Sequence, residues 1–213
     1  MKKYILFDHD GVLVETENWY YEANKKALNT IGIDLPLEEY LVNMAHGIST
    51  WETVSNAGVD DTTISECRKL RNQYYQEYLI AEDIEIPGVM ATLDQLAPRF
   101  KMAIVTTSKR PDFQLIHQYR HILNYMAFAL TVEDYEKAKP HPEPYLTALK
   151  KFGAKAGEAV VVEDSARGLK SAVAAGIDCI VVANQFTASH DLSAATLKIS
   201  SFSELPDAIS MLS

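Results

Sequence analysis

Residues 4–16 read Tyr4-Ile-Leu-Phe-Asp8-His-Asp10-Gly-Val-Leu-Val-Glu-Thr16, in which an apolar run ends on an acid and a second acid follows two residues later. An apolar, aromatic-rich run of this length predicts a short buried strand over Tyr4–Phe7. Three later runs have the same form: Met102–Val105, Ala159–Val162 and Cys179–Val182. Continuous apolar strands are typical of a parallel sheet that is buried on both faces.

Helical patterns separate these runs. We expect helices over Met90–Leu96, Phe113–Leu123, Pro144–Lys151 and Gly168–Ala175. Strands that alternate with helices predict an α/β fold, a Rossmann-like parallel sheet core with helices on both faces, formed by residues 1–15 and 85–213. Residues 16–84 show helical patterns only, so we expect a small all-helical domain inserted after the first strand.

Composition and charge exclude several classes of protein. Lys and Arg number 20 and Asp and Glu 29, and the net charge of −9 argues against binding to nucleic acid or an anionic membrane. No apolar stretch approaches the roughly 20 residues that a membrane span needs, and the first apolar run is too short for a signal peptide. Cys67 and Cys179 lack metal-type spacing and suit a reducing compartment. We therefore predict a cytoplasmic protein.

Polar residues follow the predicted strands at their carboxyl ends, where open parallel sheets bind ligands. Asp8, Thr106 and the pair Glu163 and Asp164 stand at these positions, and Lys139 lies in a loop. This set suits phosphoryl transfer, because an anionic phosphate ester needs a cation and fixed donors around its oxygens. Thr106 would donate a hydrogen bond to phosphate, and Lys139 would add a positive charge. The simpler alternative for each residue is a helix cap, a turn or a solvated loop.

The acids of the set have distinct chemical uses. Asp8, Glu163 and Asp164 supply the oxygen ligands that Mg²⁺ prefers. Asp8 can also attack phosphorus and form an aspartyl-phosphate. Asp10 can protonate the leaving oxygen and later activate water for hydrolysis.

Four motifs, met in order along the chain, resemble those of the haloacid dehalogenase superfamily. They are Phe-Asp8-His-Asp10-Gly-Val, Val-Thr106-Thr107-Ser108, Lys139-Pro-His-Pro and Val-Val-Glu163-Asp164-Ser165. The resemblance covers essentially the whole chain. Residues 16–84 resemble the helical cap domain of the phosphoglycolate phosphatase and β-phosphoglucomutase branch.

The resemblance implies a role for each motif residue. Asp8 would be the nucleophile, and Asp10 would be the acid and base that also offers a backbone carbonyl to the metal. The catalytic residues would be Asp8, Asp10, Thr106 and Lys139. The phosphate would be held by Thr106, the Thr107 amide and Lys139. The Mg²⁺ ligands would be Asp8, Asp10, Glu163 and Asp164.

Residues at which this chain differs from particular members of the superfamily indicate which activity to expect. Dehalogenases lack the second acid, so Asp10 argues against dehalogenation. β-Phosphoglucomutases carry a His where this chain has Tyr20, and at Thr50 an Arg that grips a second phosphate, so transfer to water is favoured. We predict a Mg²⁺-dependent phosphatase that acts on a small phosphomonoester of the sugar phosphate or phosphoglycolate type. The alternatives are a phosphosugar mutase, a phosphonatase that uses Lys25 or Lys26, and a catalytically weak phosphate-binding protein.

Substrate specificity is expected in the helical insert. Arg71 looks like the basic substrate-contacting position of this branch, with a surface ion pair as the equal alternative. The loop of His46 and Gly47 would approach the substrate from another side, although a structural role suits His46 better. Thr16 and Tyr20 complete this group, and Thr16 would also serve as a hinge or helix cap.

His9 departs from the usual motif, whose middle residue is more often apolar or small. Strand alternation predicts that its side chain points away from Asp8 and Asp10, so we interpret it as a packing variant. For the whole protein, the expected partner is a small-molecule phosphate ester. We expect no nucleic acid, no membrane, and a monomer or weak homodimer.

Overall fold

The computed structural model describes residues 1–212. Its contacts divide the chain into two compact units, residues 1–15 with 85 onward, and Thr16–Ile84. We call the first unit the core and the second the insert. No helix among the described residues is long and apolar enough to cross a bilayer.

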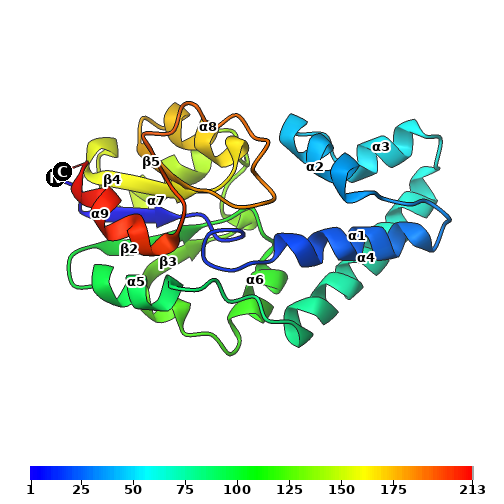
Figure 1. Ribbon diagram of the computed structural model, residues 1–213, viewed down its shortest axis with the longest axis horizontal. Helices are drawn as coiled ribbons and strands as arrows, with labels where there is room; N and C mark the ends of the chain where they lie inside the picture. The colour runs from blue at the N-terminus through cyan, green and yellow to red at the C-terminus, as the bar shows by residue number, and fades with distance from the viewer. Residues whose placement is uncertain (213) are drawn as a thin grey trace. The chain divides into compact units, whose positions relative to one another are not determined.

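Six parallel strands form the sheet of the core, in the order β3-β2-β1-β4-β5-β6 (Figure 1). They are β1 (Tyr4–Phe7), β2 (Lys101–Val105), β3 (Met126–Leu130), β4 (Ala159–Glu163), β5 (Asp178–Val182) and β6 (Leu197–Ile199). Phe7 pairs with Ile104 of β2 and with Val162 of β4. The residues that follow these three strands therefore meet at one edge of the sheet.

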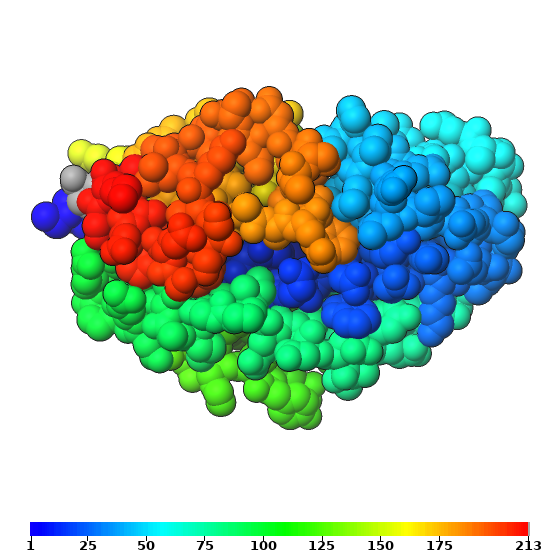
Figure 2. Space-filling model, viewed as in Figure 1, coloured from blue at the N-terminus to red at the C-terminus, as the bar shows by residue number. Residues whose placement is uncertain are grey.

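Helices cover both faces of this sheet, which confirms the predicted Rossmann-like core (Figure 1). On one face, α7 (Glu143–Phe152) and α8 (Ala166–Ala174) pack on the even-numbered side chains of β1, such as Leu6. On the other lie α5 (Val89–Leu96) and α9 (Leu205–Ser210), which are side by side at the surface in Figure 2. The central strands β1, β2, β4 and β5 are buried from solvent on both faces, which explains their continuous apolar sequences.

Two strands and the end of one helix differ from the predictions. The edge strands β3 and β6 were not predicted. Strand β6 has only three residues, whereas β3 has an apolar sequence like that of the predicted strands, although it is only partly buried. The helix expected over Phe113–Leu123 is wrong at its end. The observed α6 spans Arg110–His117, and a separate 3-10 turn, Ile122–Tyr125, follows it. The chain must leave the helix there to enter β3 at Met126.

The insert is all-helical. Its helices are α1 (Glu17–Asn29), α2 (Leu37–His46), α3 (Thr50–Asn56) and α4 (Asp61–Ala81). Helices α1 and α4 pack along each other, with the ring centres of Tyr20 and Tyr75 5.2 Å apart, and Ser49 and Asp60 cap α3 and α4 by accepting backbone hydrogen bonds. An amphipathic helix pair of this kind buries its apolar face without a strand.

Candidate active site

Three charged side chains meet at the carboxyl edge of the sheet. Asp8 follows β1, Glu163 ends β4, and Lys139 reaches between them from the loop before α7. The Lys139 Nζ donates to Asp8 Oδ1 at 2.7 Å, to Glu163 Oε1 at 2.7 Å and to the Val105 carbonyl at 2.8 Å. The sequence predicted that these three residues would lie together, and the structure brings them within hydrogen-bonding distance.

Burial controls the electrostatics of this trio. It raises the pKa of Asp8 to about 6, and the charge of Glu163 adds to the effect while Lys139 opposes it. Burial alone would lower the pKa of Lys139, but the two carboxylates outweigh it and raise that pKa. Burial would likewise raise the pKa of Glu163, and the neighbouring Lys139 charge lowers it instead. Lys139 and Glu163 are therefore a charged pair at neutral pH.

Glu163 is fully buried and receives hydrogen bonds on both carboxylate oxygens. The Tyr145 hydroxyl donates to Oε1 at 2.7 Å, and the Ser165 hydroxyl donates to Oε2 at 3.1 Å. Gly168 leaves the room that this carboxylate occupies, because a Cβ there would overlap it. These hydrogen bonds compensate for the free-energy cost of removing a carboxylate from water.

Asp10 is held by two hydroxyl groups from the segment that follows β2. Its Oδ2 accepts from Ser108 Oγ at 2.5 Å and from Thr106 Oγ1 at 3.3 Å. Thr106 was predicted to donate to phosphate, but in this structure its hydroxyl donates to Asp10 and accepts from the Ser108 amide at 3.0 Å. Thr107 is half-buried beside it, and its hydroxyl accepts from Arg167 at 3.3 Å.

The carboxylates fit a hard divalent cation. Oxygens of Asp8, Glu163 and Asp164 lie within 4.8 Å of one another. The Asp164 Oδ2 accepts from Asn184 Nδ2 at 2.7 Å, and a Cβ at Gly11 would overlap that same carboxylate oxygen. Oxygen-only donors held by neighbouring hydrogen bonds are the chemistry that Mg²⁺ prefers. The side chain of Asp10 is outside this group, and a metal contact through its backbone carbonyl stays a prediction.

His9 does not point away from Asp10, so that prediction is wrong. Its Nδ1 lies 3.4 Å from Asp10 Oδ2, and its Nε2 lies 2.9 Å from His117 Nε2. Residue 9 follows the end of β1, where the chain turns and strict strand alternation no longer holds.

Arg71 of the insert is buried, which overturns the surface alternative. Its Cζ lies 4.4 Å from the Tyr20 ring centre and 5.8 Å from that of Trp51, and its Nη1 donates to Asn24 Oδ1 at 3.4 Å. Among residues 1–212, no carboxylate lies within ion-pairing distance of this guanidinium. A buried guanidinium that contacts aromatic rings and an amide, but no carboxylate, has the chemistry to bind an anionic or polar ligand.

The other predicted residues of the insert occupy helix ends. His46 is the last residue of α2, Gly47 is its left-handed C-cap, and both are exposed. The His46 ring bonds the Val42 carbonyl at 2.7 Å, as suits a structural residue. Thr16 is buried at the N-cap position of α1, but its side chain does not accept the capping hydrogen bond.

Sequence reasoning missed Tyr145, Asn184 and His117. Asn184 had a usable signal, since it comes two residues after the last apolar run, where strand-end polar residues are expected. Tyr145 and His117 lie within helical patterns, and nothing local distinguishes them from other buried residues. Only the fold brings the Tyr145 hydroxyl to Glu163 and the His117 ring to His9.

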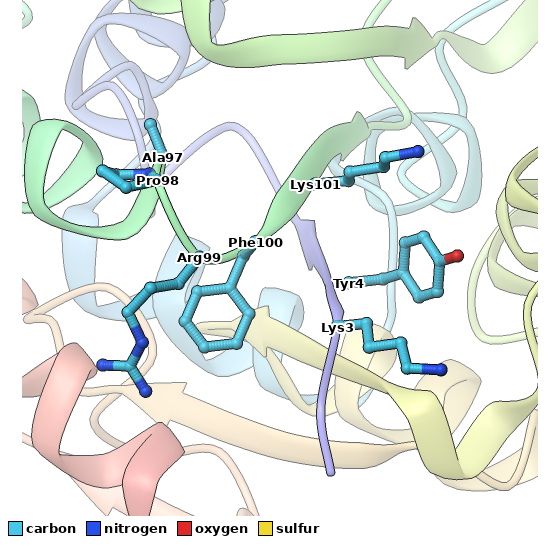
Figure 3. Close-up of a pocket in the computed structure, with 7 residues that line it drawn as sticks. All are labelled: Lys3, Tyr4, Ala97, Pro98, Arg99, Phe100 and Lys101. Atoms are coloured by element: carbon cyan, nitrogen blue, oxygen red, sulfur yellow. The ribbon is translucent and has the colours of Figure 1, made fainter.

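A pocket of about 320 Å³ lies at the opposite, amino edge of the sheet (Figure 3). Its cations do not converge, because Lys3 and Lys101 extend to one side and Arg99 to another. Lys3 is also paired with Glu158 at 2.7 Å. The pocket is separate from the carboxylate edge and lacks its chemistry.

Comparison with known proteins agrees with this geometry. The family model of haloacid dehalogenase-like hydrolases matches residues 5–182. The protein CbbY of Rhodobacter capsulatus is 28% identical, covering 92% of each chain. Glycerol-1-phosphate phosphohydrolase 2 of Saccharomyces cerevisiae is 28% identical over 85% of this chain and 74% of its own. A crystal structure of CbbY from Rhodobacter sphaeroides, in complex with phosphate, superposes with a TM-score of 0.80 at 24% identity and covers 96% of both chains.

Proposed function

Because the chain belongs to the haloacid dehalogenase-like hydrolase family, we propose that it is a Mg²⁺-dependent phosphatase of small phosphomonoesters. The observation that carries this proposal is the placement of Lys139 between Asp8 and Glu163 beside the acid Asp10. The yeast relative is named as a phosphohydrolase, which supports the same reaction class.

The reaction proceeds in two transfers at phosphorus. The Asp8 carboxylate attacks phosphorus, the bond to the leaving oxygen breaks, and Asp10 gives its proton to that oxygen. The Asp10 carboxylate then takes a proton from water, which attacks the aspartyl-phosphate and releases phosphate and Asp8. The Thr107 amide donates to the phosphate oxygens, and Lys139, whose three protons face Asp8, Glu163 and the Val105 carbonyl, contributes its positive charge beside them. Asp8, Glu163, Asp164 and the Asp10 carbonyl would hold Mg²⁺, which would supply positive charge beside the phosphoryl group.

Substrate class depends on the insert. The buried guanidinium of Arg71 is supported by Tyr20 and Trp51 and lacks a carboxylate partner among the described residues. We propose that it recognises a carboxylate or hydroxyl group of the ester, and that His46 and Gly47 line the substrate's path. The matched comparison is Arg71→Met with Arg68→Met, an exposed arginine of the same helix. The first should lower kcat/KM for a carboxylated ester such as phosphoglycolate about tenfold, and the second should leave it unchanged.

The decisive experiment follows free phosphate released from a panel of phosphate esters in Mg²⁺. Wild type should release phosphate from at least one small ester, and Asp8→Asn should abolish release. Full activity in Asp8→Asn would refute the assignment of Asp8 as the nucleophile. Interconversion of hexose phosphates without phosphate release would identify a mutase, and inertness across the panel would favour a phosphate-binding protein.

A further inference from the structure

Two buried histidines contact each other beside the acid and base of the site. His9 follows β1, and His117 is the last residue of α6. Their Nε2 atoms lie 2.9 Å apart, and the Phe113 ring packs on both, with ring centres 5.0 Å from His9 and 4.5 Å from His117. Within residues 1–212, the Nδ1 atom of each ring is buried and without a hydrogen-bond partner.

A short contact between two imidazole nitrogens holds a single proton, so one ring donates and the other accepts. His117 is neutral near neutral pH, because burial, followed by the charges of His9 and Arg120, lowers its pKa to about 3. The direction of the hydrogen bond is therefore a choice between tautomers.

The neighbouring acid selects one direction. The His9 Nδ1 lies 3.4 Å from Asp10 Oδ2, so a proton there faces a carboxylate oxygen, whereas a lone pair would face it unfavourably. With a single proton on His9, that proton lies on Nδ1, so His9 accepts at Nε2 and His117 donates from its own Nε2. The 3.4 Å separation is longer than a well-formed hydrogen bond, so the contact acts chiefly through charge and dipole.

We propose that His117 and His9 form a positioning pair that orients the Asp10 carboxyl group through its Oδ2. Ser108 and Thr106 donate to the same oxygen, so these contacts together restrict rotation of the carboxyl group. Neither histidine touches the reacting atoms; their effect reaches the reaction through Asp10. The inference rests on the proposed phosphatase activity, in which Asp10 protonates the leaving oxygen.

Two esters with different leaving groups distinguish a misplaced Asp10 from a general loss of activity. An alkyl phosphate needs a proton on its leaving oxygen, whereas p-nitrophenolate leaves without one, so misplacing Asp10 should penalise the alkyl ester selectively. In His9→Phe and His117→Leu, we expect kcat/KM for the alkyl ester to fall about tenfold relative to kcat/KM for p-nitrophenyl phosphate. His117→Gln keeps an amide donor and should restore much of the ratio. Phe113→Leu disturbs the same packing without a polar change and should leave the ratio unaltered.

Equal losses on both esters in the two histidine variants would overturn the proposal. A second measurement does not depend on turnover. Long-range ¹H–¹⁵N spectra of the imidazoles should show the proton on Nε2 in His117 and on Nδ1 in His9, and the opposite tautomers would also overturn the proposal. Inertness of the wild type toward both esters would refute the phosphatase function alone, because the spectra would still decide the pair.

Discussion

Replacing Lys139 by methionine removes the ammonium group that lies between two carboxylates. Its Nζ is 2.7 Å from both Asp8 Oδ1 and Glu163 Oε1, and its side chain is 3% exposed. Glu163 would keep Tyr145 as a donor but would lose its positive partner. Removing one partner of a buried ion pair costs about 3–5 kcal/mol, a large part of the roughly 5–15 kcal/mol that stabilises a protein. We expect the free energy of unfolding, measured with urea in EDTA at neutral pH, to fall by that amount.

A matched variant and a change of pH test whether charge is the cause. Lys137→Met makes the same substitution at an exposed side chain of the same loop and should change stability by less than about 0.5 kcal/mol. Burial, and then the Glu163 charge, already raise the pKa of Asp8 to about 6 in the presence of Lys139. Without the lysine this pKa rises further, so the folded variant binds protons before the unfolded chain does. The stability difference from wild type should therefore narrow as pH falls from neutral toward about 6, the wild-type value, where Asp8 becomes protonated in both folded proteins.

The reasoning would be refuted if Lys139→Met cost no more than Lys137→Met. It would also be refuted by a stability difference that stays constant from neutral to acidic pH, since that would indicate lost packing instead of lost charge.

Three other predictions test the surroundings of the site. Gly168→Ala would force a Cβ onto the Glu163 carboxylate and should cost at least about 1–3 kcal/mol of stability, whereas Gly157→Ala, which has open space, should be nearly neutral in the same urea titration. In acid, His117→Gln should lose less stability than wild type. The folded pKa of His117, about 3, lies below the ordinary histidine pKa of about 6.5, so the unfolded chain is protonated first as pH falls below about 6.5, at a cost of at most about 2 kcal/mol by pH 5. Calorimetric titration should detect Mg²⁺ binding to the wild type, and Asp164→Asn should weaken it at least tenfold if the acid cluster is the metal site.

Much of the fold could be predicted from local sequence. Strands β1, β2, β4 and β5 are buried on both faces, so their sequences are apolar without interruption, and this signal survives without tertiary information. The edge strand β3, Met126–Leu130, also has an uninterrupted apolar sequence, so the same signal was present there, although β3 was not predicted. The same reasoning located Asp8 and Glu163, since a polar residue directly after a buried strand must emerge at the carboxyl edge.

What the sequence determined by itself was the order of the strands along the chain, the edge where the acids gather and the residue types suited to phosphoryl transfer. The tertiary structure decided which polar atoms meet. Lys139 and Asp8 are separated by 131 residues, and His9 and His117 by 108, so only the packing of α6 and the loop before α7 on the sheet makes these contacts. His9 illustrates the physical reason. Strand alternation dictates side-chain direction while the strand lasts, and beyond its last residue the turn and its long-range neighbours decide.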